Sequence, residues 1–229
     1  MPLDYLAWCE RLRTFLKQAA RLPGAVSVSD SIQRPEDENN YPASLSEVQS
    51  SLLADVFGFL RDASARCAFD YDWTPTAGWR ERLCEFYPQL DSIRGGADLC
   101  EMAAYSNYAN RDLIANLIPF GSWYKPDPPL YDGFVRLTSP RHGSSEREVA
   151  LRCGDGADRS VYLVDPQNKS DKQRISMSFD EFLSDWETIR YVELSFDHLQ
   201  PWLDRDSGLL RPDADRAARW QALFDEAAA

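Results

Sequence analysis

The feature that most constrains the fold of this chain is a strand followed by a capped amphipathic helix between residues 161 and 189. Val161 to Val164 is a β-branched and aromatic run that ends at Asp165-Pro166, because proline cannot continue a strand ladder. Ser178 and Glu181 have capping-box spacing, in which the glutamate reaches back to the amide of the cap itself. We expect a charged loop after the strand and then a helix. Its apolar stripe is Phe179, Phe182, Leu183, Trp186 and Ile189.

A second short strand is predicted just before this unit, over residues 148–153. Gly154-Asp155-Gly156 follows it and supplies residues that accept positive φ, so the two strands and the turn predict a hairpin. With Asp158, the same turn has some likeness to a calcium loop. It lacks the alternating acids and the bidentate glutamate of an EF-hand, which favours the hairpin turn.

The rest of the chain mixes helical and strand patterns without a strict alternation of the two. This order favours an α+β fold over a doubly wound sheet. The predicted elements are a helix over 3–21, a polar loop over 27–42, a helix over 44–66, a half-buried strand over 68–73, a short helix over 79–86, a chain break at Gly95-Gly96, a helix over 110–117 and a terminal helix over 212–228.

Composition limits the classes of function. The formal charge of −12 over 229 residues disfavours binding to nucleic-acid phosphates and favours a basic protein partner. No run reaches the length of a membrane span, and the N-terminus lacks the basic start and apolar region of a signal peptide, so we expect a cytoplasmic protein. Five scattered cysteines without a C-x-x-C pair argue against a zinc site or a disulfide framework. We expect neither a metal nor a cofactor.

Two aspartates are the candidates for chemistry. Asp70 and Asp72 alternate with Phe69, Tyr71 and Trp73, which places both carboxylates on one face of the strand. On an open face they form a solvent-exposed row, and in a cleft they attract an arginine or lysine. Paired carboxylates also suit a small hydrolase, in which the loop residue His142 could take part. The other histidine, His198, is expected to be a packing or surface residue.

Aromatic residues in the proline-rich stretch 123–143 are the second candidate surface. Trp123, Tyr124 and Tyr131 are of the residue types that dominate protein interfaces, because they bury large areas at a low cost in rotamer entropy. The alternative is that these rings pack back onto the core.

Several of these landmarks together resemble the SUKH superfamily, which includes a yeast cell-wall synthesis regulator and many bacterial toxin-immunity proteins. They are the leucine-rich helix that ends in Phe57 to Ser64, the aromatic strand Phe69 to Trp73, Gly95 to Leu99, Leu117 to Phe120, and the strand and Ser-Phe-x-x-Phe-Leu helix of 161–186. Many members carry a Gly-Asp pair soon after the landmark that corresponds here to Pro119-Phe120. Here the first such pair is Gly154-Asp155, which is either the displaced equivalent or only a turn.

The resemblance implies one domain over residues 1–229, built as a mostly antiparallel central sheet with helices packed around it. Its core would cover 44–189, with a helical extension and loop before it (1–43) and a helical extension after it (190–229). The resemblance further implies a non-catalytic protein-binding role. The leading hypothesis is an immunity protein that neutralises a bacterial toxin, for example one with a basic nuclease domain. A small hydrolase and an intracellular regulatory scaffold are the alternatives. The expected partner-binding residues are Asp70, Asp72, Trp123, Tyr124, Tyr131 and Asp155.

Overall fold

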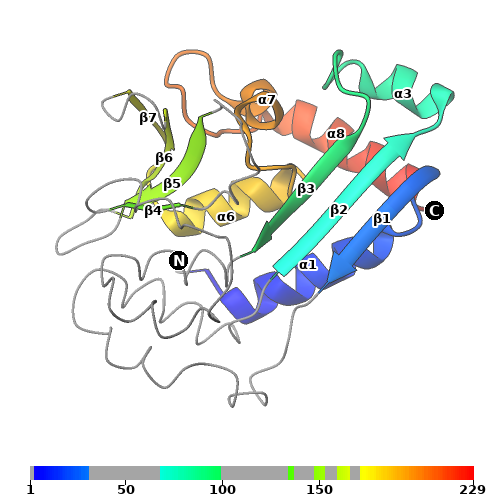
Figure 1. Cartoon of the computed structure of the whole chain (residues 1–229), viewed down its shortest axis with the longest axis horizontal. Helices are drawn as coiled ribbons and strands as arrows, with labels where there is room; N and C mark the ends of the chain where they lie inside the picture. The colour runs from blue at the N-terminus through cyan, green and yellow to red at the C-terminus, as the bar shows by residue number, and fades with distance from the viewer. Residues whose placement is uncertain (1–2, 31–67, 99–133, 137–146, 153–158, 166–170) are drawn as a thin grey trace, which may run out of the picture.

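The computed structural model describes residues 3–30, 68–98, 134–136, 147–152, 159–165 and 171–229 (Figure 1). Within these ranges the chain combines helices with two antiparallel sheets, which is the α+β class expected from the sequence. The strands are divided between two sheets, so the described residues do not show the one central sheet that the resemblance implies. The helices predicted over 44–66 and 110–117 lie outside the described residues.

The first sheet has the strand order β1-β2-β3, with β1 (Gly24–Asp30), β2 (Ala68–Pro75) and β3 (Ile93–Asp98). The half-buried strand predicted over 68–73 is confirmed as β2, which is the central strand. Two other predictions were wrong here. Residues 27–30 belong to strand β1 rather than to a loop, and Gly95-Gly96 lies within β3 rather than breaking the chain.

The physical reason for both errors is tertiary. β1 shows only Val26 and Val28 as an apolar pattern, and its ladder with β2 stabilises a serine-rich sequence of low strand propensity. At Gly95 the strand passes so close to its neighbours that a Cβ atom would lie 2.1 Å from the carbonyl oxygen of Tyr191. Glycine is required there by close packing, and the strand continues through it.

The second sheet has the order β4-β5-β6-β7, with β4 (Phe134–Arg136), β5 (Glu148–Arg152), β6 (Val161–Val164) and β7 (Lys172–Ser176). The predicted antiparallel pair of β5 and β6 is confirmed. The segment between β6 and the following helix was predicted to be a charged loop, and this is wrong for residues 172–176. They form the outermost strand of the order, in which Lys172 and Arg174 are exposed and Ile175 is buried, so polar residues obscure the strand pattern.

The helices are α1 (Tyr5–Ala19), α3 (Ala77–Leu83), α6 (Phe179–Thr188), α7 (Phe196–Leu199) and α8 (Ala214–Ala227), with a 3-10 turn η4 (Gln200–Trp202). Aspartate or serine caps the three longest of these helices. The side chains of Asp4, Ser178 and Asp213 accept hydrogen bonds from the amides of Ala7, Glu181 and Arg216, respectively. The helices predicted over 3–21, 79–86 and 212–228 and the capped amphipathic helix predicted after Ser178 are thus confirmed, with ends that differ by a few residues.

Helices α1 and α8 pack against one face of the first sheet (Figure 1). The ring of Phe15 in α1 meets Tyr71 edge-on at 5.3 Å, and Phe224 in α8 meets Trp73 at the same distance. Side chains from α1, β2, β6, α6 and α8 belong to one hydrophobic cluster. The first and last helices therefore help to build the core.

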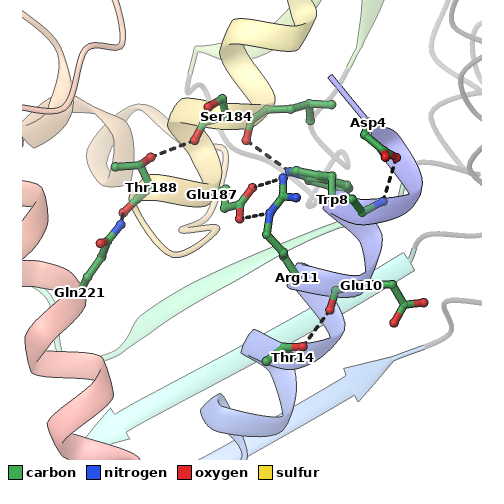
Figure 2. A network of polar contacts seen from close by, with 11 residues as sticks. Asp4, Trp8, Glu10, Arg11, Thr14, Ser184, Glu187, Thr188 and Gln221 are labelled. Carbon is green, nitrogen blue, oxygen red and sulfur yellow. Dashed lines mark hydrogen bonds and ion pairs between the residues drawn. The ribbon is translucent and has the colours of Figure 1, made fainter. Parts of the chain in front are cut away.

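Helix α6 is joined to α1 and α8 by polar contacts as well as by packing (Figure 2). The indole of Trp8 donates to the carbonyl oxygen of Leu183 at 3.3 Å, and the guanidinium of Arg11 forms a two-pronged ion pair with Glu187. On the side of α8, the amide of Gln221 donates to the carbonyl oxygen of Thr188 at 2.8 Å. Since α1 and α8 also cover the first sheet, these contacts fix α6 relative to that sheet.

The chain turns sharply after α6 through Arg190 and Tyr191, whose φ angles of 63° and 54° are unusual for residues other than glycine. Buried side chains from several elements satisfy the backbone of this turn. Trp220, Tyr71 and Trp186 donate to the carbonyl oxygens of Ile189, Arg190 and Val192, respectively. The ring of Tyr191 packs among those of Trp8, Phe15, Phe69 and Trp186. The strained turn is held by the aromatic core, because every one of these donors comes from a buried ring.

Candidate functional site

The candidate site is the outer face of the first sheet, the face turned away from α1 and α8. In β2 the side chains of Phe69, Tyr71 and Trp73 are almost fully buried, while Asp70 and Asp72 are only partly buried. Because strand side chains alternate between faces, both carboxylates lie on the outer face, as the sequence predicted.

Neighbouring strands decide what surrounds the two carboxylates. Ser27 and Ser29 of β1 are in register with Asp72 and Asp70, respectively, and both serines are exposed. On the other side, Arg94 and Gly96 of β3 are in register with the same two aspartates. Cross-strand partners share a face, so the outer face carries polar side chains, which are small on its β1 side.

Arg94 and Asp72 form an ion pair across this face. The Nε atom of Arg94 lies 3.0 Å from Oδ2 of Asp72, and the two side chains are 46% and 36% exposed. The pair is therefore partly solvated and adds little to stability. It orients the Asp72 carboxylate toward β3, and sequence reasoning missed it because the pairing depends on the register between two segments about twenty residues apart.

For the hydrolase hypothesis, this geometry gives one carboxylate of the pair a cationic partner. The Asp72 carboxylate is thus already held in an ion pair by a guanidinium of the same sheet. His142, the other residue that this hypothesis used, lies outside the described residues.

His198 is buried, with 6% of its surface exposed, and it packs against the ring of Tyr87. Its Nδ1 atom lies 2.9 Å from the hydroxyl of Ser195 and 3.6 Å from a carboxylate oxygen of Glu193. A serine, a histidine and an acid thus meet here, but both partners lie at the same ring nitrogen. A catalytic triad places the acid and the nucleophile on opposite nitrogens, so this cluster has a different arrangement. The packing role expected for His198 is confirmed.

One carboxyl group in the described residues has a strongly shifted acidity that the sequence analysis missed. Burial, reinforced by the nearby charge of Glu181, raises the pKa of Asp185 to about 6, and Arg211 opposes the shift. The sequence signal was available, since Glu181 and Asp185 are four residues apart and like charges at this spacing share a helix face. Burial also raises the pKa of Tyr71 and Tyr87, whose hydroxyls donate to the carbonyl oxygens of Arg190 and His198, respectively.

The other predicted partner-binding residues cannot be placed beside Asp70 and Asp72. Trp123, Tyr124, Tyr131 and Asp155 lie outside the described residues, as does the turn Gly154-Asp155-Gly156. In the part of the chain that the structure describes, no cluster of three or more histidine, cysteine or acidic residues could hold a metal ion. No helix within the same ranges has the length and apolar character that a membrane crossing requires.

Comparison with known proteins gives no relative for this chain. No family model matches it, and no curated protein or solved structure matches it either.

Proposed function

We propose that this chain is a non-catalytic protein-binding domain, and that it acts as an immunity protein that neutralises a bacterial toxin. The observation that carries the proposal is the outer face of the first sheet. There the sheet turns its aromatic side chains into the core and presents Asp70 and Asp72 on the opposite face. A sheet that carries partly exposed acidic groups on its outer face is suited to a basic partner.

The charge of the whole chain supports the same partner class. A formal charge of −12 attracts a basic protein over distances longer than any single contact and accelerates its association. Nuclease toxins bind anionic nucleic acid and therefore carry basic surfaces, which makes them suitable partners for an acidic inhibitor. The sequence resemblance to SUKH immunity proteins points in the same direction.

Co-expression with the product of a neighbouring toxin gene tests the proposal. We expect the two proteins to co-purify and the chain to protect cells from the toxin. Replacement of Asp70 by asparagine should weaken binding about tenfold, on the order of 1.4 kcal/mol, because the substitution removes charge from the binding face.

Asp206→Asn is the matched control, since Asp206 is an exposed aspartate in a turn away from this face. It should leave binding within about twofold of the wild-type value. Failure to bind or protect against any neighbouring toxin would contradict the proposal. Stable binding to a host protein without protection would instead favour a regulatory scaffold.

A further inference from the structure

The two outer strands of the first sheet differ in what lies beside them. Along β3, the chain after α6 forms a bridge between Val192 and Gly95, and the amide of Glu193 donates to the carbonyl oxygen of Arg94 at 2.7 Å. Along β1, β2 is the only strand among the described residues that pairs with it. Figure 1 shows β1 as the outermost strand on this side. The edge of β1 is thus the place where the sheet can grow.

Strand β1 also lacks three features that commonly prevent growth at a sheet edge, namely a bulge, a proline and a lysine. Its pairing with β2 is regular over seven residues without a bulge, and Gly24–Asp30 contains neither proline nor lysine. In an edge strand, every second residue directs its N–H and C=O groups away from the sheet, where they can pair with another chain. Natural edge strands commonly carry a bulge, a proline or a lysine, which prevents this pairing. Gly24, Ala25, Ser27 and Ser29 are exposed, which leaves this edge accessible.

The side chains beside this edge define what an added strand would need. On the outer face, the added strand would lie next to Ser27 and Ser29. Asp72 and Asp70 lie one strand further, in β2, whose backbone would be about 10 Å from that of the added strand. The small serine side chains leave a path over which a long lysine or arginine can reach the carboxylates. On the other face, the added strand would meet the partly buried Val26 and Val28.

We propose that β1 is the docking edge for an extended segment of a partner protein, which adds to the sheet as a further strand. The segment alternates basic and apolar residues, with its basic side chains over the outer face and its apolar ones beside Val26 and Val28. This mode of recognition supplies affinity through main-chain hydrogen bonds and specificity through alternate side chains. The inference rests on the proposed binding function and adds to it the docking site and the kind of segment recognised.

Charge distinguishes this occupant from a second copy of the same chain. Two copies would each bring a charge of −12, and the pairing of two β1 edges would bring together two faces that carry Asp70 and Asp72. Like charges across an interface oppose association, whereas a basic segment is attracted. A partner strand with basic residues therefore fits this edge better than self-pairing does.

The test uses the full chain and a synthetic ten-residue peptide that alternates valine and lysine. We expect binding, with amide hydrogen-exchange protection at every second residue of β1 in NMR spectra. A peptide of the same composition arranged as one valine block and one lysine block should bind at least tenfold more weakly, because it keeps the charge but loses the alternation. The double variant Ser27→Lys/Ser29→Lys should weaken binding of the alternating peptide at least tenfold. Ser184→Lys, which changes an exposed serine of α6, should change it less than twofold.

Three results would each overturn the proposal. They are equal binding of the two peptides, new hydrogen-exchange protection that spares β1, and self-association of the chain through β1 in sedimentation experiments. The same variants separate it from the proposed function. If the cognate toxin binds the wild type and the Ser27→Lys/Ser29→Lys variant equally, the immunity role stands and the docking edge is wrong. If the peptide binds at β1 but no toxin is neutralised, the immunity role is wrong and the docking edge stands.

Discussion

At Gly95, strand β3 packs closely against both β2 and the turn that follows α6. A Cβ atom at this position would lie 2.1 Å from the carbonyl oxygen of Tyr191 and 2.1 Å from an edge carbon of the Tyr71 ring. Neither atom can move easily. The Tyr191 carbonyl belongs to the strained turn after α6, and the Tyr71 ring is fully buried with its hydroxyl bonded to the carbonyl of Arg190. The position has no room for even a methyl group.

Replacement of Gly95 by alanine should therefore lower the free energy of unfolding by at least about 3 kcal/mol, the upper range for overpacking. Urea unfolding followed by tryptophan fluorescence measures this change. Gly78→Ala is the matched control, since nothing lies within 4 Å of its Cβ position and it lies in α3. It should raise stability by about 0.5 kcal/mol through helix propensity. Similar effects of the two substitutions would mean that the close approach at Gly95 is wrong.

The ionisation of Asp185 makes stability depend on pH with a sign opposite to that of most surface acids. Its pKa of about 6 in the folded chain exceeds the ordinary value of 3.8, because burial and the charge of Glu181 disfavour the ionised form. Between these two pH values the folded chain keeps a proton that the unfolded chain releases. This contribution to stability is therefore complete below about pH 4 and is lost as the pH rises through 6.

The variant Asp185→Asn should remove this penalty. At pH 7 we expect it to be more stable than the wild type by on the order of 1 kcal/mol, after a reduction for solvent screening of a half-exposed carboxyl. The difference should shrink toward pH 4, and thermal unfolding across this pH range measures it. Asp180→Asn in the first turn of the same helix should act with the opposite sign, because Asp180 accepts a hydrogen bond from the Leu3 amide. A stability difference for Asp185→Asn that does not depend on pH would contradict the argument.

At the scale of elements, α6 shows how a local signal in the sequence becomes a defined helix start. The amide of Glu181 donates to the hydroxyl of Ser178 at 3.1 Å, as predicted. The return hydrogen bond of the capping box differs from the prediction by one residue. The Glu181 carboxylate accepts from the amide of Met177 rather than from that of Ser178. It also lies 3.5 Å from the hydroxyl of Ser176, at the end of β7. The cap thus links the helix to the strand before it.

Replacement of Ser178 by alanine should cost about 1 kcal/mol of stability, the usual effect of the loss of an N-terminal cap. Ser184→Ala on the exposed side of the same helix provides the control and should be neutral or slightly stabilising, because alanine has the higher helix propensity. Chemical denaturation of the two variants side by side makes the measurement. If Ser184→Ala is as destabilising as Ser178→Ala, the cap has no special role.

Elements could be predicted from the sequence where their own residues carry a strong apolar period. This holds for α1, α6 and α8, and for β2 with its three alternating aromatics. It fails for β1 and β7, in which two valines and one isoleucine, respectively, are the only large apolar side chains turned inward. Such strands are specified by the hydrogen bonds that they form with neighbouring strands. A single sequence does not reveal the strand register that brings Ser27 or Arg94 beside Asp72. The two aspartates of the candidate site were therefore predictable, and the rest of their surroundings was not.

At the scale of the whole molecule, the charge of −12 makes partner association sensitive to ionic strength. We expect the association rate with a basic partner to fall at least about tenfold between 0.05 and 0.5 M salt, because counterions screen the long-range attraction. The dissociation rate, set by short-range contacts, should change much less. Stopped-flow measurements provide both rates. An association rate that does not change with salt would mean that charge does not select the partner.

The contact between Trp8 and Leu183 has a consequence for the order in which the molecule can form. The two residues are 175 positions apart, and the same helices are joined again by Arg11 and Glu187. At roughly 5 to 20 residues per second, a ribosome needs about 9 to 35 s to make the intervening chain. During that time the Trp8 face of α1 is outside the ribosome without α6 to cover it. During the synthesis of each molecule there is therefore an interval in which α6 cannot bury the Trp8 side chain. In that interval the helix depends on the strands made before α6, or on a chaperone, to shield this side chain from water.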